Sequence, residues 1–346
     1  MNTNTKKASR IFELDFIRCV CTLCVILIHT SSTFIFAKSS LSLSGVNAAF
    51  FINQISRFAV PLFILLSGIS LSEKNVKPLS FFKSRFTKII LPYILWSFVY
   101  LASEGSLKML SNLRSAANIF LLGSSAAHLW FVPVISQLYL LFFILKFFTR
   151  KNKTALLIVT FAMSLYCQTG VFLSVFGINI LPEFLRAYMW ILFPCWIFYF
   201  TLGLCITKDY LLKIIDFGKK YLFVFASVSL LLGILITYES VRTSTYSLSI
   251  KPLLLPYTVL AAIFLLAAGS VLHKIKIVKY ISSGISELSY TIYLCHILFL
   301  NFFIKYDIFR KGMLGFALLS FAVIISSILF SVLYNRVIKF IKSRKK

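Results

Sequence analysis

The chain is a succession of apolar runs of about 20 residues, and this feature restricts its fold more than any other. As an α-helix, a run of that length crosses the roughly 30 Å hydrocarbon core of a bilayer. Of the 346 residues, 59% are hydrophobic and 13% are charged, whereas a soluble domain averages about 25% charged residues. The sequence therefore predicts an all-α, polytopic membrane protein.

We expect about ten transmembrane helices in a single domain that covers residues 1–346. Lys6, Lys7 and Arg10 precede the first run as they would in a signal peptide. That run is long for a signal peptide and many more follow it, which favours a signal anchor. The predicted spans lie near 15–36, 49–72, 89–107, 131–148, 155–172, 190–207, 221–238, 253–272, 285–304 and 313–335.

The positive charge is concentrated on alternate connections between these spans. A net charge of +26 would suggest a nucleic-acid partner for a soluble protein. Here 25 of the 36 Lys and Arg lie in segments that fall on one side of the predicted topology. By the positive-inside rule, both termini are then cytoplasmic. The bilayer accounts for the charge, so we expect no nucleic acid among the partners.

Two ionisable residues, Arg18 and His29, lie inside the first apolar run. Ionisable residues in hydrocarbon are costly, and they usually face a protein interior or a wet cavity. Eleven helical residues turn through roughly 1100° and rise roughly 16 Å. Arg18 and His29 therefore share one helix face with Asp15 and form a polar track from a cationic mouth to a buried base. Arg57 is a further intramembrane cation, in the second run.

The cysteines do not indicate a metal site. Cys19, Cys21 and Cys24 point to different faces of one helix, which gives no metal-ligand geometry. They are best interpreted as small apolar packing residues, and no metal is expected.

Five segments, in this order, resemble motifs of the acyltransferase-3 family of multi-pass membrane acyltransferases. Leu14–Arg18 with His29 is similar to that family's Arg-x10-His signature, and Ser56–Gly68 is similar to its Val-Pro-Leu-Phe element. Ser84–Tyr93 is similar to its basic cytoplasmic motif. His128–Phe131 is similar to its His-Leu-Trp-Phe element, and Ser289–His296 is similar to its late Ser-Tyr-x-x-Tyr-Leu-x-His helix.

The resemblance implies acyl transfer from a cytoplasmic acyl-CoA, commonly acetyl-CoA, to a hydroxyl of a bacterial surface polysaccharide or its lipid-linked precursor. It also implies a location in the bacterial cytoplasmic membrane. Some members carry a fused extracytoplasmic SGNH-type domain, which this chain lacks after its last apolar run. We therefore expect direct transfer, or a separate partner among other polysaccharide-assembly proteins.

His29 is the expected catalytic residue, either as general base for the acceptor hydroxyl or as a nucleophile that carries the acyl group. The alternative is a histidine that only packs between helices. Arg18 would hold a CoA phosphate, unless it merely pairs with Asp15. Arg57 would stabilise the oxyanion or hold an anionic sugar, unless it forms a structural ion pair with a carboxylate such as Glu104.

Lys83, Arg85 and Lys88 match what the phosphates of CoA require, although the positive-inside rule alone would also place cations there. Further residues are expected to line the acceptor side, with structural packing as the alternative for each. These candidate substrate-binding residues are Glu104, His128, Trp130, Tyr290 and His296.

Two other functions stay open at this point. One is succinyl transfer or an export-linked role in polysaccharide assembly. The other is a transporter or flippase, which would also bury charges in many spans. The sequence has no visible inverted repeat, and the Arg18 and His29 track with the basic motif at Arg85 and Lys88 favours the acyltransferase.

Overall fold

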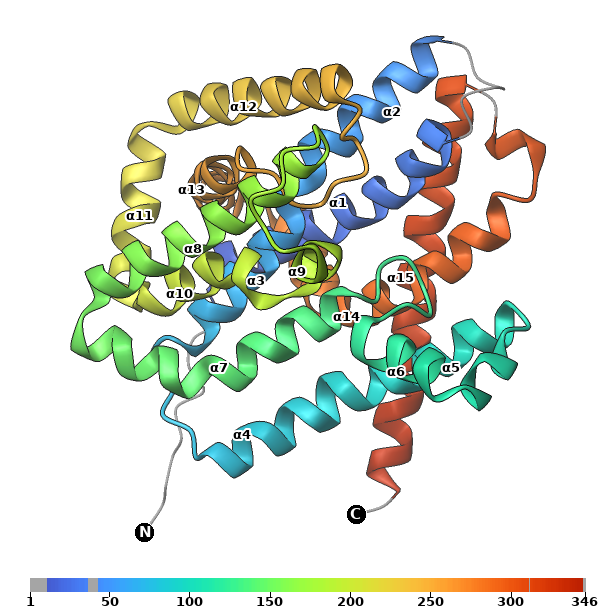
Figure 1. The fold of residues 1–346 in the computed structure, drawn as a ribbon, viewed down its shortest axis with the longest axis horizontal. Helices are drawn as coiled ribbons and strands as arrows, with labels where there is room; N and C mark the ends of the chain where they lie inside the picture. Colours follow the sequence, from blue (N-terminus) through green and yellow to red (C-terminus); the bar gives the residue numbers. More distant parts are fainter. Residues whose placement is uncertain (1–10, 37–42, 311, 345–346) are drawn as a thin grey trace.

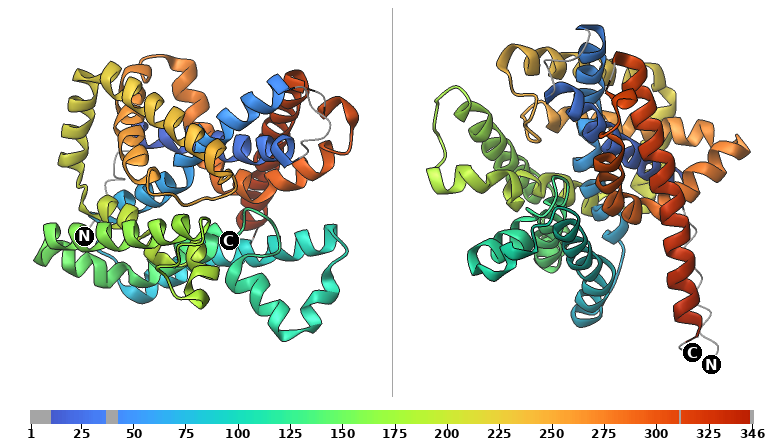
Figure 2. Two further views of the ribbon diagram at one scale, coloured as in Figure 1. Left: turned by 45° about the horizontal axis from the view of Figure 1, so that its top comes forward. Right: turned by 90° about the vertical axis from the view of Figure 1, so that its right-hand side faces the viewer.

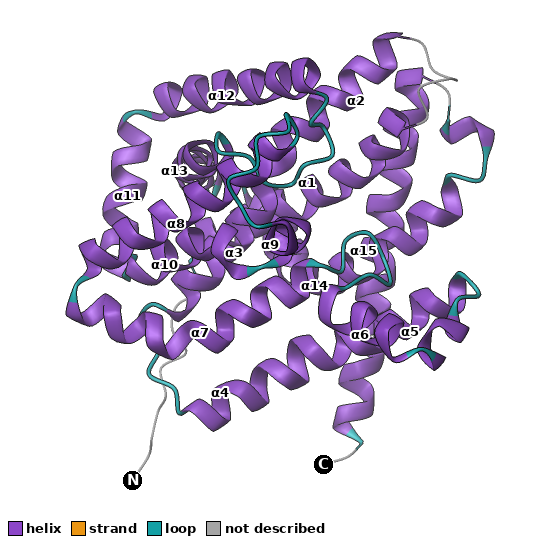
Figure 3. Ribbon diagram, viewed as in Figure 1, coloured by secondary structure: helices purple, strands orange, loops and turns teal. Residues whose placement is uncertain are grey.

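The computed structural model describes residues 11–36, 43–310 and 312–344, and these residues form helices and loops without a β-strand (Figures 1 and 3). The predicted all-α, polytopic fold is confirmed. Among the described residues, eight helices are long and apolar enough to cross a membrane. They are Ala48–Leu71, Pro78–Ser103, α7 (Phe131–Lys151), α8 (Lys153–Ser174), α12 (Leu222–Thr243), α13 (Leu254–Leu272), α14 (Lys276–Phe303) and α15 (Gly312–Ser343).

Two of the ten predicted spans are not among these eight. The span near 15–36 is α1 (Phe12–Phe36), a helix of 25 residues that carries the ionisable track. The span near 190–207 is not one helix. It consists of the 3-10 turns Met189–Ile191 and Phe193–Cys195 followed by the nine-residue α10 (Ile197–Cys205). Pro194 lacks a backbone donor and lies in the second of these turns, which explains the break.

Helix α1 lies at the centre of the bundle. It packs against α14, α13, α15, α2 (Leu43–Ile55) and α3 (Ala59–Leu71). Figure 1 shows α1 crossing the middle of the molecule, and Figure 2 shows the C-terminal turns of α15 extending beyond the other helices. The polar face of α1 is therefore enclosed by protein, which is where ionisable groups in a membrane span are tolerated.

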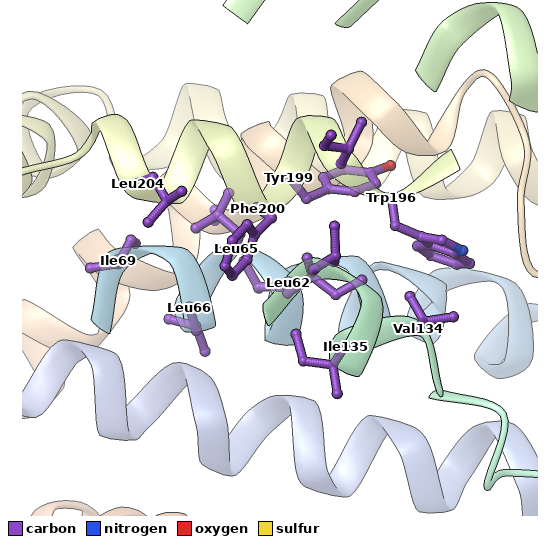
Figure 4. Packing of buried hydrophobic residues seen from close by; sticks show 14 of the residues in the cluster. Leu62, Leu65, Leu66, Ile69, Val134, Ile135, Trp196, Tyr199, Phe200 and Leu204 are labelled. Atoms are coloured by element: carbon purple, nitrogen blue, oxygen red, sulfur yellow. The ribbon is translucent and has the colours of Figure 1, made fainter. Parts of the chain in front are cut away.

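Helices α3 and α10 make the closest helix contact through two glycines. A Cβ on Gly68 would lie 2.3 Å from the Phe200 carbonyl oxygen, and one on Gly203 would lie 2.2 Å from that of Leu65. The apolar core around this contact includes side chains of α3, α7 and α10, which Figure 4 shows. Its members include Leu62, Leu65, Leu66 and Ile69 of α3, Val134 and Ile135 of α7, and Phe200 and Leu204 of α10.

The basic segment before the third predicted span is part of that span. The sequence suggests a short interfacial helix over residues 79–88 and a span from residue 89. In the structure, α4 (Pro78–Arg85), a π-helical turn (Phe86–Ile90) and α5 (Leu91–Ser103) form one continuous helix. The Tyr290 hydroxyl, 14 residues and roughly 21 Å into α14, donates to the Ile89 carbonyl at 2.7 Å. Arg85 therefore belongs to the same long helix as the third predicted span, four residues before the contact with α14.

The segment between α5 and α7 folds back toward the membrane interior. Its helix α6 (Leu113–Leu122) ends beside the beginning of α5, where the Tyr93 hydroxyl donates to the carbonyls of Ile119 and Phe120 at 3.0 and 3.1 Å. The Tyr293 hydroxyl of α14 donates to the His128 carbonyl at 2.5 Å. The long and partly apolar stretch from Lys108 to Trp130 is compatible, by sequence alone, with a re-entrant or an interfacial segment. These contacts favour the re-entrant one.

We predict that Gly123→Ala unfolds the re-entrant segment. Gly123 has a φ of 71°, and an added Cβ would lie 2.6 Å from backbone atoms of Leu129 and Trp130. Gly105→Ala is the matched control, because Gly105 has a φ of 67° and no atom within 4 Å of the added Cβ. Backbone strain of about 1–2 kcal/mol is common to both variants. The temperature of thermal unfolding in detergent should be lowered more by Gly123→Ala than by Gly105→Ala. Equal decreases in the two variants would contradict the close packing around Gly123.

Candidate functional site

Two cavities lie along α1. We call the side of the molecule that carries Lys74, Lys146 and Lys208 the basic face. The basic-face cavity has a volume of about 490 Å³, and the opposite-face cavity has a volume of about 260 Å³. The polar residues that line the basic-face cavity are Asp15, Arg18, Ser70, Ser72, Glu73, Lys74 and Lys208. Those of the opposite-face cavity are His29, Ser32, Asn53, Arg57, Trp130, Tyr246, Ser247 and Ser249.

Arg18 lies in the wall of the basic-face cavity. Its guanidinium contacts the Asp15 carboxylate at 3.3 Å and donates to the Ser70 hydroxyl at 3.0 Å. Asp15 is buried and also accepts a hydrogen bond from Ser286 at 2.8 Å. The side chain of Arg18 is 30% exposed. The ion pair with Asp15 is thus present, and it holds the cation at the cavity wall.

Two of the three basic-motif residues are close to this cavity. Partial burial lowers the pKa of Lys74, and the charges of Arg85, Arg18 and Lys88 lower it further. The Arg85 guanidinium lies over the rings of Tyr139 and Phe81, 4.6 and 5.1 Å from their centroids. This stacking directs Arg85 into the protein.

Lys83, the third residue of the basic motif, is exposed. It lies two residues before Arg85 on the same helix, which is about 200° around the helix axis. The structure therefore does not place Lys83 with Arg85 and Lys88.

His29 lies in the wall of two cavities. It lines the opposite-face cavity and a second one of about 120 Å³, which Tyr290 and Tyr293 also line. Val25, Val60 and Trp130 are common to both. His29 thus lies between two spaces that are large enough to hold parts of a ligand.

Two further histidines surround His29. The ring centroids of His29 and His296 are 5.2 Å apart, those of His128 and His296 are 4.7 Å apart, and those of His29 and His128 are 6.1 Å apart. The His296 Nδ1 lies 2.7 Å from the Tyr293 carbonyl, so it carries the proton and Nε2 is the acceptor. His296 Nε2 and both ring nitrogens of His128 are buried without a hydrogen-bond partner.

The histidine cluster is unusual because each unpaired buried polar group costs about 1–3 kcal/mol. Within the described part of the chain, no group of three His, Cys, Asp or Glu is arranged to hold a metal ion. The unpaired nitrogens instead offer one donor and two acceptors beside His29, and all three are buried.

Arg57 is 8% exposed and lies in a 3-10 turn between α2 and α3. Its guanidinium donates to the Asn53 side-chain oxygen at 2.9 and 3.2 Å, to the Leu248 carbonyl at 2.9 Å and to the Tyr246 carbonyl at 2.5 Å. These partners differ from the ion pair with Glu104 that the sequence leaves open. Glu104 is exposed at the end of α5 and is not among the residues that line the cavities.

Sequence reasoning missed Asn53, which joins Arg57 to α1. The Asn53 side-chain nitrogen donates to the Ile28 carbonyl at 2.9 Å and to the hydroxyls of Ser31 and Ser32 at 3.0 and 3.1 Å. One amide therefore joins the Arg57 guanidinium to the turns of α1 on either side of His29. An available signal was an amide four residues before an arginine in an apolar run, because that spacing places both on one helix face.

Most of the predicted site residues come together, although they lie far apart in the sequence. His29, His128, Trp130, Tyr290 and His296 surround the two connected spaces beside α1, and Arg57 lines one of them. Arg18 lines the basic-face cavity instead, and Arg85 and Lys88 lie near enough to Lys74 in its wall for their charges to lower the pKa of Lys74. The polar face of α1 thus joins two chemically different sites.

Comparison with known proteins identifies the family of the chain. A Staphylococcus aureus (strain Mu50) protein named probable poly-beta-1,6-N-acetyl-D-glucosamine export protein is 27% identical over 329 residues, which cover 89% of this chain and 88% of that protein. A Staphylococcus epidermidis protein with the same name is 26% identical over 332 residues, with 90% and 88% covered. No solved structure matches the chain. A family model described as an acyltransferase domain matches residues 11–336, and the chain therefore belongs to the acyltransferase-3 family.

Proposed function

We propose that the protein transfers an acyl group, most simply acetyl, from acyl-CoA to a hydroxyl of a surface polysaccharide or its lipid-linked precursor. The observation that carries this proposal is the position of His29. It lies on the same helix face as Arg18 but lines the cavity on the opposite side. A reaction that joins a cytoplasmic donor to an external acceptor needs such a residue.

The basic-face cavity is the proposed donor site. Acyl-CoA carries phosphates, and an arginine can bind a phosphate through two parallel hydrogen bonds. Arg18 and Lys74 line this cavity, and Arg85 and Lys88 lie near it. The thin pantetheine arm would extend along α1 toward His29 while the nucleotide stays at the basic face.

The opposite-face cavity is the proposed acceptor site. It combines the indole of Trp130, on which a sugar ring can stack, with serine hydroxyls that can bind sugar hydroxyls. The relatives of the chain are named as probable export proteins of poly-beta-1,6-N-acetyl-D-glucosamine. A polymer of that class, built from aminosugars with free hydroxyls, is the acceptor we propose.

In the proposed reaction, the acceptor hydroxyl attacks the thioester carbonyl while His29 takes up its proton. The new ester bond forms as the carbon–sulfur bond breaks, and the proton passes to the CoA thiolate. In the alternative route, His29 first receives the acyl group and then gives it to the hydroxyl. Arg57, on the wall of the same cavity, would stabilise the oxyanion that forms in either route.

Polysaccharide export is a second candidate, which the names of the relatives favour. Export requires a path for a sugar chain through the protein. The acceptor cavity has a volume of about 260 Å³, which is enough for only a small part of a polysaccharide chain. We therefore propose acyl transfer as the function, and the experiment below distinguishes it from polysaccharide export.

We predict that transfer requires the two substrates on opposite faces. The purified protein is reconstituted in vesicles of known orientation, with radiolabelled acetyl-CoA at the basic face and an oligomer of β-1,6-linked glucosamine derivatives at the other. Labelled glycan should form with the wild type and not with His29→Ala, at equal protein levels. Transport of unmodified glycan without acylation would favour export, and transfer with both substrates on one face would reject the proposed path.

We also predict that Arg85→Ala with Lys88→Ala weakens acetyl-CoA binding. Each charge-assisted contact is worth about 1.5–3 kcal/mol if it is desolvated, and much less if it is exposed. Lys83→Ala is the matched control, because it removes a cation of the same motif that points away from Arg85. Titration of acetyl-CoA should show a higher Kd for the double variant only. Equal Kd values for all three proteins would assign the motif to membrane topology.

A further inference from the structure

Lys251 is a buried cation in a loop, where a lysine is ordinarily exposed to solvent. It lies in residues 244–253, between α12 and α13, and its exposed fraction is 0%. Its ammonium group donates to the Ser240 hydroxyl and, at 3.5 Å, to the Gln54 side-chain oxygen. Burial of a lysine is costly, so a fully buried one calls for a specific role.

The contacts of Gln54 lead from Lys251 to Arg57. With its oxygen facing the ammonium group, the Gln54 amide directs its nitrogen toward the Asn53 side-chain oxygen at 3.1 Å and the Tyr246 carbonyl at 3.2 Å. These two oxygens are also acceptors for the Arg57 guanidinium. The Gln54 oxygen also accepts a hydrogen bond from the Ser240 hydroxyl at 2.9 Å. An amide has one acceptor end and one donor end, so Lys251 and the Ser240 hydroxyl that it contacts together fix which way Gln54 points.

The loop itself forms part of the acceptor cavity. Tyr246, Ser247 and Ser249 line that cavity, and the carbonyls of Tyr246 and Leu248 hold Arg57. The same loop therefore supplies a wall of the site, two acceptors for its guanidinium and the cation that orients Gln54.

We propose that Lys251 is a positioning residue for acyl transfer. Its ammonium group fixes the Gln54 amide, which together with Asn53 fixes the Arg57 guanidinium at the cavity that His29 lines. The inference rests on the proposed function, and it adds a residue that acts through Gln54 and does not line the cavity.

The electrostatic surroundings make this role dependent on pH. Burial, followed by the charge of Arg57, lowers the pKa of Lys251 to about 7, and Glu239 of α12 acts in the opposite direction. The titratable group nearest on α13 is Tyr257, whose hydroxyl donates to the Ile55 carbonyl at 2.6 Å. Lys251 is charged below this pKa and neutral above it, so the orienting charge is lost as the pH rises through about 7.

The test uses the full chain in oriented vesicles with acetyl-CoA and the β-1,6-linked glycan. Lys251→Met should lower kcat by about 10- to 100-fold, the usual cost of a misplaced catalytic group, with little change in KM for acetyl-CoA. The wild-type rate should fall as the pH rises through about 7, and Lys251→Arg should resist that fall because a guanidinium stays charged. Arg242→Met, which removes an exposed cation at the end of α12, should match the wild type.

A wild-type kcat in Lys251→Met, or the same alkaline fall in Lys251→Arg as in the wild type, would overturn the inference. If Lys251→Met does not fold, the inference is tested by the pH dependence of the transfer rate of Lys251→Arg compared with that of the wild type. A wild-type protein that transfers no acyl group contradicts the proposed function instead. In that case a double-mutant cycle of Lys251→Met and Arg57→Met on thermal unfolding still tests the link, and strictly additive losses would exclude it.

Discussion

The side chain of Asn53 makes the contact on which the rest of the site depends. Its two ends join α1, which carries His29, to the turn that carries Arg57. Charged and polar groups inside a membrane protein are stable only when each finds a partner, since lipid supplies none. One amide with both ends occupied satisfies this requirement and at the same time sets the spacing of the two residues beside the acceptor cavity.

The two ends of α1 lie in chemically different surroundings. The end of α1 toward the basic face lines the basic-face cavity together with cations, while its other end lies beside histidines, aromatic rings and a folded loop. Phosphates suit the first environment and sugar rings the second. Under the proposed function, one polar helix face would serve two substrates of opposite chemical character.

Local periodicity was sufficient to predict part of this site. Arg18 and His29 share a face because eleven residues complete almost three helical turns, and this holds whatever surrounds the helix. The gathering of His128, Trp130, Tyr290 and His296 came only from the resemblance to the family, because contacts between distant segments leave no periodic signal. Lys251 was not predictable in this way: its burial depends on Ser240 and Gln54, which lie 11 and 197 residues away.

The differences between the predicted and the observed fold also arise from contacts between distant segments. A π-helical turn joins the basic segment to the third span, and the hydroxyl that contacts it belongs to Tyr290. The break near residue 194 is visible locally as a proline, yet the core that accommodates the short α10 requires Gly68 of another helix. The sequence thus predicts each helix better than it predicts where a helix bends, because bends depend on neighbours.

The two tyrosines of α14 have a consequence for the order in which the chain assembles during synthesis. Tyr290 and Tyr293 donate to the carbonyls of Ile89 and His128, which emerge from the ribosome 201 and 165 residues earlier. Until α14 enters the membrane, the re-entrant segment lacks these two donors and the histidine cluster lacks His296. The part of the chain that precedes α14, residues 1–275 of 346, is therefore an incomplete intermediate in the bilayer, and the site is completed only when α14 is inserted.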